Sequence, residues 1–135
     1  MSTMTTDDII AALQSKYAPG FGWTERQILL TGSDVEKWSG QTGLFVGVLY
    51  DALALKLALG FHSNKLDFTF CDQVVNELYS TILPRKEGPP AFFWSVFLAF
   101  DAGEYYHDGN RSINSVEAYT RPQIAQIVQR HAPER

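Results

Sequence analysis

An acidic side chain and a histidine lie three positions apart in the segment FDAGEYYH, residues 100–107. Residues three and four positions apart share one face of a helix, so Glu104 and His107 would lie one turn apart, with Asp101 at the edge of that face. The spacing Glu-x-x-His can place two ligands on one metal ion, as in di-iron and di-manganese helical bundles. Those bundles use two copies of the motif, and this chain has one.

Two interpretations of this cluster remain open from the sequence. In the first, Glu104 and His107 are metal ligands of a metal- or small-molecule-binding bundle, and the other ligands come from elsewhere in the chain. The acidic and histidine side chains available for that purpose are Asp51, His62, Asp72 and Glu77. In the second, the carboxylates accept hydrogen bonds from Tyr, Trp or backbone donors, since a carboxylate beside aromatic rings needs partners or takes up a proton. The single copy of the motif favours the second interpretation.

Other chemical patterns in the chain are incomplete. Residues 108–114 place oxygen-bearing side chains at alternate positions, as calcium loops do, but Ile113 and Tyr119 occupy the positions that need Gly and Glu. Cys71 falls on the apolar face of a predicted helix, and Asp72 beside it disfavours the thiolate that a nucleophile needs. The chain has no Gly-x-Ser-x-Gly or phosphate-binding motif. We therefore expect a non-catalytic protein without a cofactor.

The elements that would position these residues are helices. Thr5 with Asp8, and Thr120 with Gln123, have the spacing of helix-capping boxes, and Pro89-Pro90 can open a helix because its first turn needs no donor. Such signals predict helices at about 6–17, 41–61, 68–83, from Pro90 to about His107 and from Thr120 to about His131, with two short helices after Thr24 and Ser33. Asp67 or Thr69 would cap the helix at 68–83.

The helix predicted at 41–61 is apolar almost all round, which is typical of a central helix. No segment shows convincing strand alternation. We therefore predict an all-α fold, a single helical domain over residues 1–135, with a bundle of five to seven helices around a central apolar helix.

The composition narrows the class of partner. The net charge is −4 and the densest basic spot is Arg85-Lys86, so the chain lacks the basic stripe of a nucleic-acid binder. The apolar stretch 44–61 contains Asp51 and Lys56, which disfavours a membrane span. With one cysteine and no signal-peptide pattern at residues 1–8, we expect a cytoplasmic protein that contacts neither nucleic acid nor membrane.

Eighteen aromatic residues, nine Phe, six Tyr and three Trp, are more than a chain of 135 residues readily buries. Aromatic side chains are enriched at binding hot spots. The sequence therefore favours a small protein that binds another protein, of a regulatory or immunity type, or binds a second copy of itself as a homodimer. The predicted binding residues are Trp94, Asp101, Glu104, Tyr105, Tyr106 and His107.

Overall fold

The computed structural model describes residues 4–17, 28–104 and 114–131. These residues form six α-helices and one π-helical turn, and no strand occurs among them. In chain order the elements are α1 (Thr6–Lys16), α2 (Gly32–Thr42), α3 (Val46–His62), α4 (Phe68–Ile82), α5 (Ala91–Asp101), the π-helical turn η3 (Val116–Thr120) and α6 (Arg121–His131). The predicted all-α bundle is confirmed.

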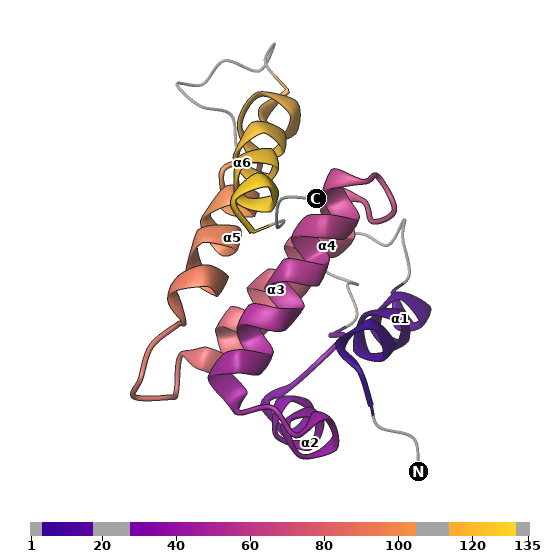
Figure 1. Ribbon diagram of the computed structural model, residues 1–135, viewed down its shortest axis with the longest axis vertical. Helices are drawn as coiled ribbons and strands as arrows, with labels where there is room; N and C mark the ends of the chain where they lie inside the picture. The colour runs from indigo at the N-terminus through magenta and orange to yellow at the C-terminus, as the bar shows by residue number, and fades with distance from the viewer. Residues whose placement is uncertain (1–3, 18–27, 105–113, 132–135) are drawn as a thin grey trace.

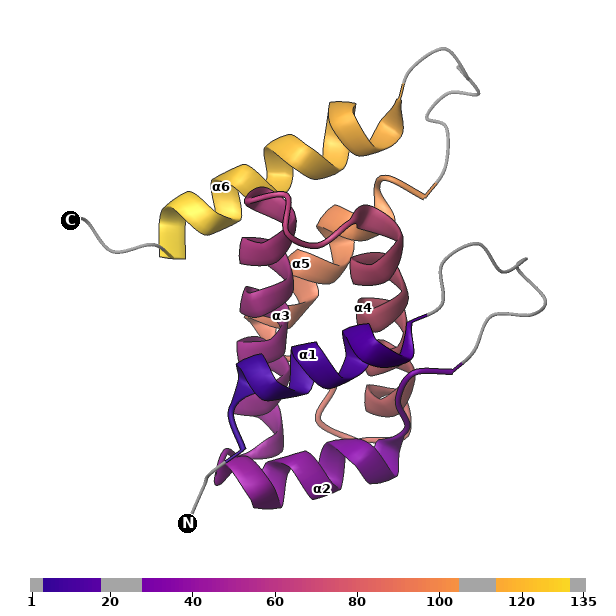
Figure 2. The same ribbon diagram turned by 90° about the vertical axis from the view of Figure 1, so that its right-hand side faces the viewer.

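The arrangement has α3 at its centre. Helices α3, α4 and α5 run along the length of the molecule, α1 and α2 cross one end, and α6 lies across the other end (Figures 1 and 2). Helix α3 contacts each of the other five α-helices. Seven of its residues are buried, as its apolar side chains on nearly every side led us to expect of a central helix. That prediction is confirmed.

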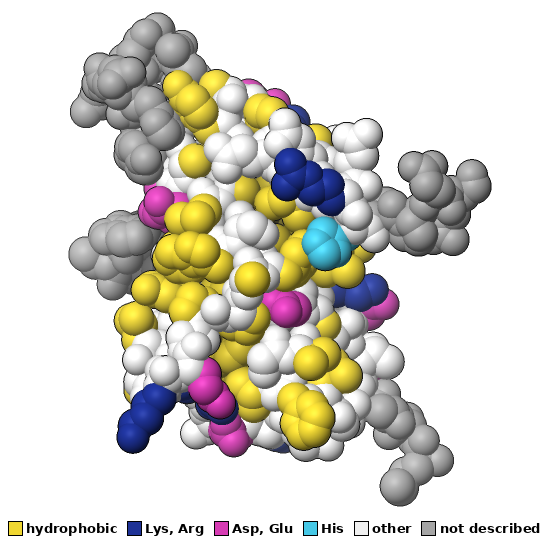
Figure 3. All heavy atoms as spheres, turned by 60° about the vertical axis from the view of Figure 1, so that its left-hand side comes forward, with side chains coloured by type: hydrophobic (Ala, Val, Ile, Leu, Met, Phe, Trp, Pro, Cys, Tyr) yellow, Lys and Arg dark blue, Asp and Glu magenta, His cyan; other side chains and the backbone are white. Residues whose placement is uncertain are grey.

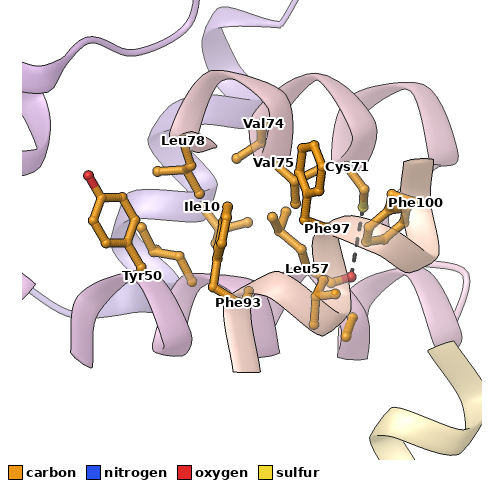
Figure 4. Close-up of a cluster of buried hydrophobic side chains, with 14 of the residues drawn as sticks. Ile10, Tyr50, Leu57, Cys71, Val74, Val75, Leu78, Phe93, Phe97 and Phe100 are labelled. Atoms are coloured by element: carbon orange, nitrogen blue, oxygen red, sulfur yellow. Dashed lines mark hydrogen bonds between the residues drawn. The ribbon is translucent and has the colours of Figure 1, made fainter. Parts of the chain in front are cut away.

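The core is aromatic where α3, α4 and α5 meet (Figure 4). The ring of Phe61 meets Phe100 edge-on, with ring centroids 5.4 Å apart, and Tyr50 lies beside Phe93 at 5.8 Å. Edge-to-face pairs of this kind contribute about 0.5–1.5 kcal/mol each beyond the area they bury. Packing in this three-helix core therefore determines which side chains of α5 are exposed to solvent.

Several helices begin where the local sequence signals predicted. Asp8 and Thr5 form the expected capping box at α1, and the Asp67 carboxylate accepts a hydrogen bond from the backbone nitrogen of Phe70 at 2.8 Å. Helix α2 begins at Gly32, earlier than the predicted start after Ser33, because Asp34 accepts a hydrogen bond from the backbone nitrogen of Thr31. The short helix predicted after Thr24 starts outside the described residues, and its predicted continuation through residues 28–30 is wrong, because these residues are not helical.

One helix boundary differs because of a glycine. Helix α3 begins at Val46 and not near residue 41, since residues 41 and 42 still belong to α2. Gly43 then ends α2 with a φ of 75°, a left-handed conformation that glycine adopts without a steric penalty.

The start of the last helix is also different from the prediction. Thr120 does not cap a helix: it is buried, and its hydroxyl donates a hydrogen bond to the Ala99 carbonyl of α5 at 2.7 Å. The helical segment starts earlier, where the Asn114 side chain accepts from the backbone nitrogens of Val116 and Glu117. The tertiary bond to α5 thus takes the hydroxyl that local geometry would have used as a cap.

Among the described residues, no single helix is both long enough and apolar enough to cross a membrane. Helices α2 and α3 pass that test of length and composition only when taken together, and they are bent by 95° at their junction.

Candidate functional site

The predicted site residues lie at the end of α5, which stops sooner than the sequence indicated. Asp101 is the last residue of α5, and the backbone nitrogens of Gly103 and Glu104 then bond to carbonyls three positions earlier. Glu104 is an exposed residue of this turn. The prediction that the helix from Pro90 continues to about His107 is therefore wrong, because the chain leaves the helix after Asp101.

Gly103 lies in the turn after α5 and has no room for a side chain. A Cβ atom built on Gly103 would lie 2.5 Å from the Thr120 hydroxyl oxygen and 2.9 Å from the ring of Phe68. The turn after α5 packs directly against η3 and against α4, so only a residue without a side chain fits without a shift of its neighbours.

The two described carboxylates of the predicted cluster lie beside α4. Glu104 accepts a hydrogen bond from the Asn76 side-chain amide at 2.9 Å, and the same amide lies 3.2 Å from a carboxylate oxygen of Asp72. Partial burial raises the pKa of the Asp101 carboxyl, and the nearby Glu104 charge raises it further. The end of α5 therefore gathers negative charge. Tyr105, Tyr106 and His107 lie outside the described residues.

Trp94, the remaining predicted residue, belongs to a stack of three aromatic rings between α4 and α5. Its ring lies parallel to Phe97, with centroids 5.1 Å apart and planes 10° apart. Tyr79 of α4 covers the pair, at 4.8 Å from Phe97 and 5.6 Å from Trp94. Trp94 and Tyr79 are only partly buried, so their rings contribute to the surface.

Exposed leucines extend this stack on both sides. Leu83, four positions after Tyr79, is 62% exposed, and Leu98, four positions after Trp94, is 44% exposed. We call the surface formed by Tyr79, Leu83, Trp94 and Leu98, together with the buried ring of Phe97 that stacks on Trp94, the α4–α5 aromatic face. Figure 3 shows hydrophobic side chains gathered in a band on the side of the molecule where α5 comes forward, with acidic side chains at the edge of the band.

The contribution of α4 to this face was not predicted from the sequence. Asp72, Asn76, Tyr79 and Leu83 follow each other at spacings of four, three and four, which places them on one side of a helix. That periodicity was the available signal. It was hidden because the buried stripe of the same helix, which includes Val75 and Leu78, has the same spacing.

The side chains considered as further metal ligands are dispersed. Asp51 accepts a hydrogen bond from the backbone nitrogen of Phe93, Glu77 accepts from those of Leu29 and Leu30, and His62 is exposed at the end of α3. In the part of the chain that the structure describes, no three His, Cys, Asp or Glu side chains lie close enough to hold a metal ion. The Glu104 and His107 pair extends beyond those residues.

Cys71 lies in the core. It is fully buried, and its thiol points to the Leu57 carbonyl oxygen at 3.7 Å (Figure 4). Burial raises the pKa of the Cys71 thiol, and the nearby Asp67 and Asp72 charges raise it further. A buried thiol of raised pKa is a weak nucleophile, so the geometry supports the structural interpretation of Cys71.

A second surface feature lies at the amino ends of α3 and α5. A depression of about 520 Å³ is lined by Phe45, Gly47 and Tyr50 on one side and by Arg85, Glu87 and Pro90 on the other. Arg85 forms a salt bridge with Glu36 at 3.0 Å, and the Tyr50 hydroxyl bonds to Thr81 at 2.6 Å. The polar groups facing this depression thus have partners within the protein.

No protein-family model matches the chain, and neither the curated proteins nor the solved structures include a match to it.

Proposed function

We propose that this protein binds another protein through the α4–α5 aromatic face. The observation that carries the proposal is the partly exposed pair of rings Tyr79 and Trp94, which stack on the buried Phe97 and are extended by the exposed side chains of Leu83 and Leu98. Large aromatic side chains with apolar neighbours form the centres of protein interfaces, where they lose little conformational entropy on binding.

The remaining properties of the chain support a binder without catalytic activity. The chain is small and acidic, and it has the aromatic excess expected of an interface protein. A regulatory or immunity-type binder that works in the cytoplasm fits these properties, and the single buried cysteine suits a reducing compartment.

Surface substitutions test the proposal. Leu98→Ser and Leu83→Ser remove exposed apolar area from the α4–α5 aromatic face without opening the core. Val48→Ser is the matched control, because Val48 is 51% exposed on α3, away from this face. Each protein is tagged, expressed in its own cells and cross-linked, and the captured proteins are quantified by mass spectrometry.

We expect a defined partner that is captured by the wild type and by Val48→Ser and is captured several-fold less with Leu98→Ser and with Leu83→Ser. Removing one exposed leucine from an interface centre costs about 1 kcal/mol or more, which corresponds to roughly fivefold weaker binding. Equal capture by all four proteins would show that the α4–α5 aromatic face is not the binding surface.

A second candidate is self-association through α3. Phe45 and Val48 are 85% and 51% exposed, Leu59 is 38% exposed, and Leu55 lies between them on the same side of the helix. This stripe is apolar, so two copies can pair about a two-fold axis without opposing like charges.

Sedimentation velocity tests this candidate. Here the α3 variants are the test, and Leu98→Ser on the α4–α5 aromatic face is the control. We expect Phe45→Ser and Val48→Ser to shift a dimer to monomer, and Leu98→Ser to leave the dimer intact. A wild-type protein that sediments as a monomer at high micromolar concentration would exclude self-association through α3.

A further inference from the structure

The α4–α5 aromatic face has two carboxylates, those of Asp101 and Glu104, at the end where α5 stops. Tyr79 meets Trp94 and Phe97, whereas Asn76, one turn earlier in α4, meets Glu104 beyond the end of α5. Helices α4 and α5 are therefore antiparallel along this face. Asp101 and Glu104 lie at the carboxyl end of α5, beyond Leu98, at one end of this face.

This end of the face is electrostatically unfavourable in the protein as it stands. The carboxyl end of a helix carries a partial negative charge, so acidic residues there are destabilising. Among the described residues, the salt bridges pair other side chains, and no Lys or Arg forms one with Asp101 or Glu104. Glu104 instead bonds to the neutral amide of Asn76. A cation is the group that would stabilise this arrangement.

We infer that the partner segment covering the α4–α5 aromatic face is an amphipathic helix that carries Lys or Arg at one end, opposite Asp101 and Glu104, and apolar side chains over Trp94 and Leu98. This inference rests on the proposed function and adds the chemistry of the partner. A purely apolar segment would remove water from both carboxylates without replacing it, which is costly. An Arg side chain can also stack on the exposed part of an aromatic ring.

The dimensions of the face suit a helix. Amphipathic helices bind hydrophobic grooves through side chains at positions i, i+3, i+4 and i+7, and these span about two turns. Leu98 to Trp94 is one turn of α5, and Asp101 adds nearly one more turn toward the acidic end. A partner helix that lies along α5 would thus place its apolar side chains and its cation on successive turns.

Peptide selection tests the inference with defined probes. A phage-displayed library of random peptides, long enough for about four helical turns, is selected on the complete wild-type protein. The dissociation constants of enriched synthetic peptides are then measured by fluorescence anisotropy. The variants are Leu98→Ser and Leu83→Ser, the control Val48→Ser, and the double variant Asp101→Asn with Glu104→Gln, which removes both charges and keeps side-chain size.

We expect enriched peptides with Lys or Arg at one end of an apolar stripe. Their binding should weaken about tenfold in the double amide variant, as is typical for close charge pairs at an interface, and should weaken in Leu98→Ser but not in Val48→Ser. Exchanging the Lys or Arg residues of a peptide for Glu should abolish binding to the wild type and restore it to a protein with Asp101→Lys and Glu104→Lys.

The outcomes separate the inference from the proposed function. Peptides that lose binding in Leu98→Ser, yet carry no basic residues or bind the double amide variant unchanged, overturn the inference and leave the proposed function standing. Enriched peptides that bind Leu98→Ser and Leu83→Ser as well as they bind the wild type overturn both, as does a selection without enriched sequences. Thermal unfolding of each variant shows that it is folded.

Discussion

The carboxylate of Asp51, in the middle of α3, accepts a hydrogen bond from the backbone nitrogen of Phe93 in α5 at 2.8 Å. Phe93 lies in the first turn of α5, where backbone nitrogens have no partner within the helix. The residue at the N-cap position, Pro90, has no side-chain group that could cap the helix. Asp51 therefore supplies from another helix the capping group that α5 itself lacks, and its charge suits the positive end of the helix.

Replacing Asp51 should destabilise the protein through the start of α5. Asp51→Ala removes the acceptor, and loss of a capping side chain costs about 0.5–2 kcal/mol. Asp51→Asn keeps one oxygen acceptor and should cost less. Urea unfolding followed by circular dichroism measures both values. Equal stability of Asp51→Ala and the wild type would show that the bond to Phe93 contributes nothing.

Glu77 of α4 should be a second stabilising carboxylate. One of its oxygens accepts hydrogen bonds from the backbone nitrogens of Leu29 and Leu30 at 2.7 and 3.0 Å, and the other accepts from the Gln73 amide at 2.8 Å. Lys16 of α1 donates to the Leu29 carbonyl on the other side of the same segment. We expect Glu77→Ala to lower the free energy of unfolding by about 2 kcal/mol, since hydrogen bonds to charged groups are worth about 1.5–3 kcal/mol.

Hydrogen exchange measures whether this loss is local. In Glu77→Ala the amides of Leu29 and Leu30 should exchange faster, while those of α5 should change less. Glu77→Gln is the control that keeps an acceptor of the same size. Uniform acceleration over all helices would instead show that Glu77 acts only through global stability.

Gly103 should not tolerate a side chain. In Gly103→Ala the new methyl group would meet the Thr120 hydroxyl and the Phe68 ring at distances far below van der Waals contact. Thr120 is buried and bonded to Ala99, so it has little room to move. We expect a loss of about 1–3 kcal/mol, as for other overpacked sites, measured by thermal unfolding.

Gly40 provides the matched control for Gly103. It lies inside α2, and a Cβ atom built there meets nothing within 4 Å. Gly40→Ala should therefore raise the stability by about 0.4–1 kcal/mol. If Gly103→Ala stabilised the protein, this result would contradict the close packing of the turn after α5 against Thr120 of η3.

Asp101 should make the protein less stable as the pH rises. Its pKa is raised from the usual 3.8 by partial burial and by Glu104. The folded state therefore holds this proton more tightly than the unfolded state does. The resulting penalty is absent well below pH 3.8, grows as the pH rises above it, and is complete above the folded pKa.

Asp101→Asn removes that penalty, so its melting temperature should exceed that of the wild type at pH 7. The difference should shrink as the pH falls toward 3.8. Calorimetry at several pH values measures it, with Asp7→Asn as the control, because Asp7 is an exposed residue of α1 that pairs with Lys56 and should not stabilise the protein when replaced. An Asp101→Asn variant that is less stable at pH 7 would show that the charged carboxylate is favourable in the folded protein.

The sequence predicted where several helices begin better than it predicted where α5 ends. The boundaries at Thr5, Asp67 and Pro90 follow from caps and breaks that act within four residues of the boundary, so a local pattern suffices. The end of α5 does not follow from such a pattern. Nothing near Glu104 signals a stop except Gly103, whose role depends on the contact with Thr120.

The sequence by itself determined the fold class, the central position of α3 and the candidate residue Trp94, because hydrophobic spacing and aromatic content are properties of the chain. The tertiary structure decided what the polar residues do. Glu104 meets Asn76 from 28 positions away, Asp51 meets Phe93 from 42, and Glu77 meets Leu29 from 48. Bonds over such separations exist only after the helices have packed, and helix packing is driven by non-directional burial that leaves no local pattern for individual polar partners.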